Sequence, residues 1–274
     1  MGRPGGKLWR PSASGPQAPW SWAFSGILIG ALVALLCFAP ARWLAQAVQT
    51  ATQNRVQLAN AQGTVWSGTA QLVLGAGVGT QDSASLPGHV QWRLRPALAG
   101  AQLAVQADCC MDSAWTWIAS PTLTGLQLRS LDNNTPTPSR WPSTVLAGLG
   151  TPWNTLQLQG TLALSTQGLV LQQRAGLWEI QGSLQLDAQQ ISTSLSTLKP
   201  IGSYRLALQG GATPTLDLST LDGSLQLQGT GRWVGGRLQF TGEAKAVPER
   251  TEALANLLNI IGRRDGARSI IKVG

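Results

Sequence analysis

Leucine alternates with small polar residues at every second position over much of this chain. Between Leu156 and Leu164, leucine or glycine occupies each even position, and glutamine, threonine or alanine occupies the positions between them. Because successive side chains of a β-strand point to opposite faces, this pattern gives a strand with one apolar and one polar face. The same alternation recurs at five later places: Leu184/Leu186, Leu206/Leu208, Leu216/Leu218, Leu225/Leu227 and Leu238/Phe240. The pattern predicts a mainly β protein with antiparallel strands that bury one face.

Glycines interrupt the alternation at several places. A unit of glycine, a hydroxyl residue and leucine begins at Gly160, Gly182 and Gly223, and its unequal spacing favours a meander over a solenoid with one period. Gly235-Gly236 predicts a two-residue hairpin turn, because such turns need positive φ. Gly229-Thr230-Gly231 lacks the third glycine and the following helix of a nucleotide-binding loop, so it predicts a break in a strand. Together these features predict a long, curved antiparallel sheet.

One proline-rich segment lacks the alternation in the middle of the chain. Residues 132–142 contain three prolines, and they predict an exposed connector. A short helix is expected behind it, over residues 143–149. The connector would join two β-rich lobes of one continuous sheet, over about 44–131 and about 150–274.

A helical segment is expected near the C-terminus. Between Pro248 and Ile261, apolar residues recur at helical spacing, with proline in the first turn and Gly262 directly after the last turn. This pattern predicts a short C-terminal helix. Arg268 to Val273 then predicts a closing strand.

The N-terminal part of the chain differs from this β-rich body. Trp22 to Ala39 is a run of eighteen residues without a charge, close to the length of a transmembrane helix. Residues 1–21 contain three basic residues and no acidic ones, so the positive-inside rule predicts a cytoplasmic leader, one inner-membrane span, and a periplasmic body over residues 44–274. The alternative is a signal peptide cleaved near Ala39-Pro40-Ala41, although the apolar run exceeds the usual length of about 7–15 residues.

The charge distribution restricts the function classes. Residues 1–42 supply half of the net charge of +8. A nucleic-acid binder concentrates its basic residues on a folded face, so this distribution argues against a nucleic-acid partner. The chain has 12 acidic residues, one histidine (His89) and three cysteines, which leaves few general acids or bases and excludes a multi-cysteine zinc module. We therefore predict a protein that is not an enzyme, with no catalytic residues, no metal site and no cofactor.

Two motifs nevertheless suggest chemistry. Ser196-Thr197-Leu198-Lys199 has the S-x-x-K spacing of penicillin-recognising enzymes, but Pro200 follows at once and no K-T-G motif accompanies it, which favours a chance match. Cys109-Cys110 could form a strained, reducible ring. Two buried thiols, or a structural disulfide to another cysteine, are the favoured interpretation of this pair.

Three arginines and one tryptophan have two interpretations each. Arg263, Arg264 and Arg268 could bind anionic lipid headgroups or the acidic surface of a partner, or they could be a solvated helix end, where cations favour the helix dipole. Trp66 is expected to be a core anchor of its strand, and the alternative is a binding platform.

Several motifs resemble one known family, the type II secretion system protein N family. The similar segments lie between residue 22 and the C-terminus, and they include Gly63–Gly68, Trp92–Pro96, Gly202–Leu206, Leu221–Leu225, Gly242–Ala244 and Leu257–Gly266. None of them is a catalytic motif.

The resemblance implies an accessory inner-membrane component of the machine that exports folded proteins across the outer membrane. Its implied partners are other type II secretion components, namely the inner-membrane platform and, as a second candidate, the secretin. The fold it implies is similar to AsmA-like periplasmic β-proteins, some of which hold apolar cargo. The alternative function is therefore lipid binding or lipid transfer in the periplasm. A third hypothesis is an envelope hydrolase that uses Ser196 and Lys199.

Overall fold

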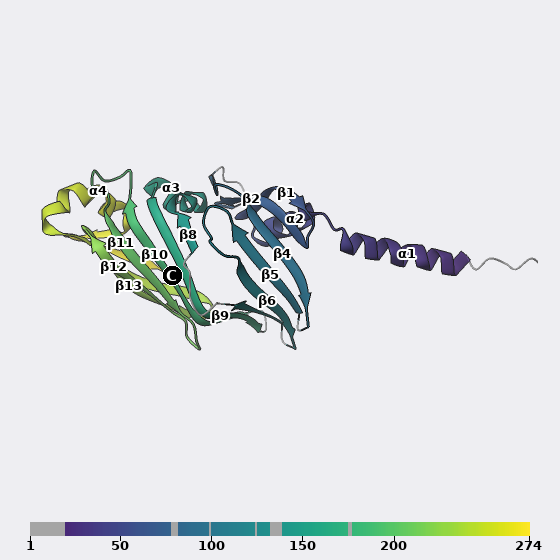
Figure 1. The fold of residues 1–274 in the computed structure, drawn as a ribbon. Helices are drawn as coiled ribbons and strands as arrows, with labels where there is room; N and C mark the ends of the chain where they lie inside the picture. The colour runs from purple at the N-terminus through teal and green to yellow at the C-terminus, as the bar shows by residue number, and fades with distance from the viewer. Residues whose placement is uncertain (1–19, 78–81, 99, 124, 132–138, 175–176) are drawn as a thin grey trace, which may run out of the picture. The chain divides into compact units, whose positions relative to one another are not determined.

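The computed structural model describes residues 20–77, 82–98, 100–123, 125–131, 139–174 and 177–274, and Figure 1 draws its ribbon. The chain forms two compact units, over residues 1–39 and residues 40–274. Each unit is described by itself.

Helix α1 (Trp20–Cys37) is the described element of the first unit. Its large apolar side chains, including Phe24, Ile27 and Leu32, are exposed. Within the described residues, no helix has both the length and the apolar character that crossing a membrane requires. The described helix runs from Trp20 to Cys37, where a transmembrane helix over residues 22–39 was predicted, and the membrane span itself stays a prediction.

Helix α2 (Ala41–Ala51) begins the second unit, in a region where a β-rich body was expected. Ala41 is buried, and it packs with Ala70 and Trp92, beside the partly buried Leu44 and Leu58. The less exposed residues of α2 recur at positions 41, 44, 45 and 48. This spacing is helical, so the pattern was present in the sequence.

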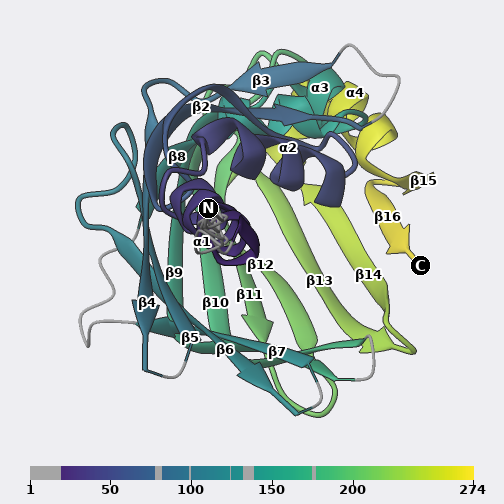
Figure 2. The ribbon, with the colours of Figure 1, turned by 90° about the vertical axis from the view of Figure 1, so that its right-hand side faces the viewer.

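The described strands form one sixteen-stranded antiparallel sheet. Its first strands are β1 (Val56–Gly63), β2 (Ser67–Gly75), β3 (Ser83–Ser85), β4 (Val90–Ala97), β5 (Gly100–Ala107), β6 (Trp115–Thr122) and β7 (Gly125–Leu131). The later strands are β8 (Ser139–Pro142), β9 (Gln159–Arg174), β10 (Leu177–Ser192), β11 (Gly202–Gln209), β12 (Thr215–Gly223), β13 (Leu225–Val234), β14 (Arg237–Ala246), β15 (Arg263–Asp265) and β16 (Arg268–Val273). Neighbours in the sheet are mostly neighbours in the sequence, and Figure 2 shows how the sheet curls. The predicted curved antiparallel meander is confirmed.

Short helices accompany the second half of the sheet. They are the 3-10 helix η1 (Ser143–Leu149), α3 (Trp153–Leu156), the 3-10 turn η2 (Pro248–Arg250) and α4 (Thr251–Ile261). The helices expected over residues 143–149 and 248–261 are therefore present, as is the closing strand β16. Figures 1 and 2 both show α3 and α4 at the same end of strands β9–β14.

The register of β10 and β11 confirms the alternation. Leu186 pairs with Leu206 and Ala188 pairs with Tyr204, while Asp187, between them, pairs with Arg205. The leucines therefore share one face of the sheet, and the ion pair lies on the other. Arg205 donates two hydrogen bonds of 2.8 Å to the Asp187 carboxylate, and these bonds hold the pKa of Asp187 below its usual value.

Glycine is required at Gly182, inside β10. The register between β9 and β10 shifts between Gln181 and Ser183, and Gly182 has φ +82° there. A Cβ at Gly182 would collide with the carbonyl group of Gly168. The glycine–hydroxyl–leucine unit therefore marks a bulge in β10, where only glycine fits. The Gly235-Gly236 turn joins β13 to β14 with φ +60° and +79°, which confirms the predicted hairpin.

Two local predictions are corrected. Of the predicted connector over 132–142, residues 132–138 lie outside the described residues, and residues 139–142 form β8, which pairs with β9. The buried part of Trp141 packs beside both neighbouring core clusters, which explains why this segment is not an exposed loop. The strand expected from Leu156 begins instead at Gln159, because Leu156 ends helix α3. The boundaries of the two lobes stay a prediction.

Trp92, and not Trp66, is the tryptophan of the N-terminal core. Trp92 is 5% exposed and Trp66 is 37% exposed. The Trp92 indole N–H donates to the Val65 carbonyl at 3.1 Å, and its ring lies so close to Gly68 that a Cβ there would collide with it. The prediction that Trp66 is a core anchor is wrong, because Gly68 leaves room for the ring of Trp92 from the neighbouring strand.

Matched alanine substitutions at the two tryptophans test this assignment. We expect Trp92→Ala to lower the free energy of unfolding by about 3–5 kcal/mol, because it removes a large buried ring. Trp66→Ala should lower it by less than about 1 kcal/mol, as is usual for exposed positions. Urea denaturation followed by circular dichroism measures both values. Equal losses for the two variants would contradict the assignment.

Candidate functional site

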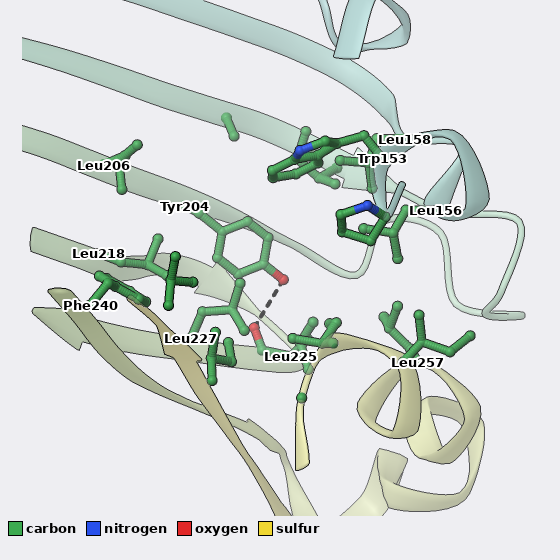
Figure 3. Close-up of a pocket in the computed structure, with 18 of the residues that line it drawn as sticks. Trp153, Leu156, Leu158, Tyr204, Leu206, Leu218, Leu225, Leu227, Phe240 and Leu257 are labelled. Atoms are coloured by element: carbon green, nitrogen blue, oxygen red, sulfur yellow. Dashed lines mark hydrogen bonds between the residues drawn. The ribbon is translucent and has the colours of Figure 1, made fainter. Parts of the chain in front are cut away.

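An apolar cavity of about 1160 Å³ lies against the sheet in the second half of the chain (Figure 3). One wall is the leucine-bearing face of strands β9–β14. The other side is formed by η1, α3, α4 and the segment from Gly262 to Val273. Of its 29 lining residues, twelve are leucine and six are isoleucine.

The alternation of the strands builds the sheet wall of this cavity. Leu186 pairs with Leu206, and Leu206 pairs with Leu218, so a row of leucines crosses three neighbouring strands. Toward β13 and β14 the row continues through Gly229 and Gly242.

Phe240 fills the space above the glycines of this wall. A Cβ at Gly229, Gly231 or Gly242 would come within 3.0 Å of the Phe240 ring. Gly229 and Gly231 lie inside β13, so the predicted strand break is wrong. The glycines make room for the aromatic ring, which covers the backbone in place of their missing side chains.

Tyr204 provides the polar group inside the cavity, and Figure 3 shows its ring between Leu206 and Leu225. It is 6% exposed, and its hydroxyl donates a hydrogen bond of 3.0 Å to the Leu225 carbonyl. Gly202 lies beneath the hydroxyl, where a Cβ would crowd it. Burial raises the pKa of Tyr204 well above its usual value. No sequence pattern gave Tyr204 a role in a site, although it is the only tyrosine in the chain.

The charged residues that line the cavity all come from one short segment. They are Arg263, Arg264, Asp265 and Lys272. Arg264 donates to the carbonyl oxygens of Gly266, at 2.7 Å, and Ala255, at 3.2 Å. These bonds link α4 to the turn before β16. The charged residues of the lining are therefore confined to the segment from Arg263 to Lys272. Arg263 pairs with Ile270 and Lys272 pairs with Thr241, so their side chains lie on the face of the sheet opposite the leucines.

The three arginines of the predicted cluster differ in their partners. Arg264 also donates to the side-chain oxygen of Asn259 in α4, at 3.3 Å. Arg268 forms ion pairs with Asp265 at 3.0 Å and with Glu243 at 3.7 Å. The Arg263 side chain is exposed, and its guanidinium has no hydrogen-bond or ion-pair partner among the described residues.

The hydroxyl of Ser196 makes two hydrogen bonds with the backbone. It is buried in the loop between β10 and β11, where its hydroxyl donates to the Ala253 carbonyl at 3.2 Å and accepts from the Leu198 N–H at 3.1 Å. Lys199 is exposed. Ser196 thus fixes this loop against the first turn of α4.

The adjacent cysteines are joined to each other. Cys109 and Cys110 form a disulfide in the segment between β5 and β6, which corrects the expectation of two thiols or of a bond to another cysteine. The Arg140 N–H donates to the Cys110 carbonyl at 2.7 Å and links this turn to β8. His89 lies directly before β4 and is exposed.

Comparison with known protein families identifies the chain. The family model described as type II secretion system (T2SS), protein N matches residues 54–271. The chain belongs to this family. The resemblance noted in the sequence is thereby confirmed, and the match extends from the residues before β1 into β16. Members are components of type II secretion, which places the chain in the cell envelope together with other components of that system. No curated protein and no solved structure matches the chain.

Tyr204→Phe tests the polar group of the cavity. At neutral pH we expect the variant to lose about 1–3 kcal/mol of unfolding free energy, because the Leu225 carbonyl loses its buried donor. Above about pH 10 the unfolded chain ionises its tyrosine and the folded chain does not, so the wild-type stability falls with rising pH. The difference between wild type and variant should therefore narrow between about pH 9 and about pH 11 in urea denaturation. A constant difference would show that Tyr204 ionises as readily as an exposed tyrosine.

Proposed function

We propose that this chain is a non-catalytic assembly subunit of the type II secretion system, which acts by contact during the export of folded proteins across the outer membrane. The observation that supports this most directly is the extent of the family match, over residues 54–271. It covers nearly the whole sheet, so the feature shared with the family is the strand framework and not a local cluster of reactive groups.

The sheet offers an edge for contact with a partner. Strand β1 ends the sheet on one side, and in the described part of the chain it is hydrogen-bonded to β2 alone. An edge strand can add a strand from another protein through backbone hydrogen bonds. A register shift between Ala59 and Gln62 interrupts the strand, as bulges do where indiscriminate edge pairing is avoided. We propose the inner-membrane platform of the secretion system as the partner, with the secretin as the second candidate.

Two observations support a periplasmic body held at the inner membrane. Cys109 and Cys110 form a disulfide, and disulfides persist in oxidising compartments such as the periplasm. Helix α1 exposes apolar side chains such as Phe24 and Ile29, which favour an apolar environment over water. We propose that α1 associates with the inner membrane while the unit over residues 40–274 faces the periplasm.

Site-specific crosslinking in cells tests the assembly role. We expect a photoreactive phenylalanine analogue at Gln62, which is exposed on β1, to crosslink to another type II secretion component. The same analogue at Gln226, exposed on the interior strand β13, is the matched control and should give no such product. Secretion of a type II substrate is measured in parallel with a strain that lacks the chain. Loss of secretion in that strain, with no crosslink from Gln62, would contradict contact through this edge.

Thiol trapping tests the proposed compartment. The chain has three cysteines, of which Cys37 is free and the other two form the disulfide. Cells are denatured in a thiol-alkylating reagent, with or without prior reduction, and the mass of the chain is measured. A periplasmic body predicts one alkylated cysteine before reduction and three after it. Three alkylated cysteines without reduction would place the body in a reducing compartment.

A further inference from the structure

We infer that the polar face of strands β13–β16 binds an extended acidic segment of a partner protein. The surface is a cationic patch formed by Arg232, Arg237, Arg263 and Lys272, all of them exposed. The inference goes beyond the proposed function and does not depend on it, because β1 and these strands lie at opposite ends of the strand order.

The register places Lys272 and Arg232 on the face opposite the leucines. Gly242 pairs with Gly229 and with Ile271, in the row that continues the leucine wall. Lys272 follows Ile271 by one residue, and Arg232 follows Gly229 by three. Because successive side chains of a strand alternate between faces, both cations point away from the cavity.

The other two cations share this polar face. Arg237 pairs with Val234, and Arg263 pairs with Ile270. Each of these partners lies two residues along its strand from a cation of the first pair, and residues two apart share a face. Figure 2 shows β13, β14 and β16 side by side near the C-terminal end of the chain.

Charges balance in the part of the face closest to α4. There Lys245 pairs with Arg268, and Arg268 forms ion pairs with Asp265 at 3.0 Å and with Glu243 at 3.7 Å. Two cations and two acidic residues therefore offset one another, and both carboxylates already have a partner.

The cationic patch has no such balance. Among the described residues, none of its four side chains has a hydrogen-bond or ion-pair partner, and Asp217 on the neighbouring β12 forms no ion pair with them. Its members are diagonal neighbours, Arg232 with Arg237 across β13 and β14, and Arg263 with Lys272 across β15 and β16. Neighbouring like charges on a sheet repel one another, so an anionic partner relieves a repulsion that the free chain carries.

The groups between the cations favour a protein partner. Thr230, Gln239 and Thr241 are exposed there, and such side chains can donate to and accept from a peptide backbone. Proteins that bind membrane surfaces add large apolar side chains that insert beneath the headgroups, and sites for single-stranded nucleic acids add aromatic rings that stack on bases. The described residues of this patch include no aromatic side chain and no leucine.

The spacing of the strands sets the length of the bound segment. Three strand gaps separate β13 from β15 in the sheet, which is about 14 Å at about 4.8 Å per gap. An extended chain covers that distance with about four residues. Arginine binds a carboxylate through two parallel hydrogen bonds, so glutamate or aspartate at alternate positions of the segment complements Arg232 and Arg263.

Fluorescence anisotropy tests the inference on the full chain in a nonionic detergent. The probe is a short fluorescein-labelled peptide that alternates glutamate with serine, and the control probe alternates glutamine with serine. We expect saturable binding of the acidic peptide that weakens as salt is added. The glutamine peptide should bind at least about tenfold more weakly.

Charge reversal assigns the peptide to the patch. Arg232→Glu with Lys272→Glu should weaken binding of the acidic peptide at least about tenfold. The matched control is Lys245→Glu with Arg250→Glu, which changes one exposed lysine and one exposed arginine outside the patch and gives the same net charge. This control should bind within about twofold of the wild type. Circular dichroism checks folding, and if the reversed variant does not fold, Arg232→Gln with Lys272→Gln should weaken binding at least about threefold.

Two further probes separate a protein partner from other polyanions. Phosphatidylglycerol vesicles and a single-stranded oligonucleotide are each titrated with the patch variant and its control. Helix α1 is identical in the two variants, so its contribution to vesicle binding is the same in both. We expect the two variants to bind each of these probes equally.

Three results would overturn the inference. The first is acidic-peptide binding no tighter than that of the glutamine peptide. The second is equal binding of the acidic peptide by the patch variant and its control. The third is a loss in the patch variant that is confined to the vesicles or to the oligonucleotide, which would assign the patch to a membrane or a nucleic acid. Each result leaves the contact proposed for β1 unaffected.

Discussion

The apolar face of strands β9–β14 is the constraint on which the rest of the second unit depends. The alternation of leucine with polar residues places most leucines of these strands on one side of the sheet, where they must be shielded from water. Helix α4 covers part of this face through Leu254, Leu257 and Leu258, all of them almost completely buried. Ser196 and Arg264 hold the first half of α4 by hydrogen bonds to the carbonyls of Ala253 and Ala255. The part of the face that α4 leaves uncovered becomes the cavity.

This arrangement explains why a β-rich member of a secretion family carries no obvious chemistry at its best-formed site. Ser196 and Tyr204 carry the hydroxyl groups that could take part in chemistry. Both hydroxyls donate to backbone carbonyls and thereby stabilise the fold. The opposite face of the same strands carries the Asp187–Arg205 ion pair and polar residues. One sheet thus has an apolar face that lines the cavity, a polar face that suits water, and an edge that suits a partner strand.

Local patterns in the sequence predicted the elements, but not how they meet. The period of two at Leu206/Leu208 and the helical spacing between Pro248 and Ile261 are local, and both elements were predicted from them. The cavity was not predicted, because its lining extends from Leu146 to Val273 and its size depends on where α4 packs. The choice between Trp66 and Trp92 depends on the pairing of Gly68 with Trp92 across two strands.

The same limitation explains the errors at Gly229 and Gly231. A sequence that lacks side chains at two nearby positions indicates a weak strand. The ring of Phe240 covers these positions from the neighbouring strand, and only the register between β13 and β14 reveals this. The sequence likewise favoured two thiols, or a bond to another cysteine, for Cys109 and Cys110, because it does not show the turn that brings their sulfurs together.

The central claim of this account is that the apolar face of β9–β14 forms one wall of an open cavity beneath α4. An experimental structure of the chain purified from its native envelope, without added lipid, tests it most directly. The account predicts that the side chains of Leu206 and Leu218 face an open cavity and that α4 covers only part of the apolar face. Helix α4 packed directly onto strands β11–β13, with the cavity closed and no density between them, would contradict it.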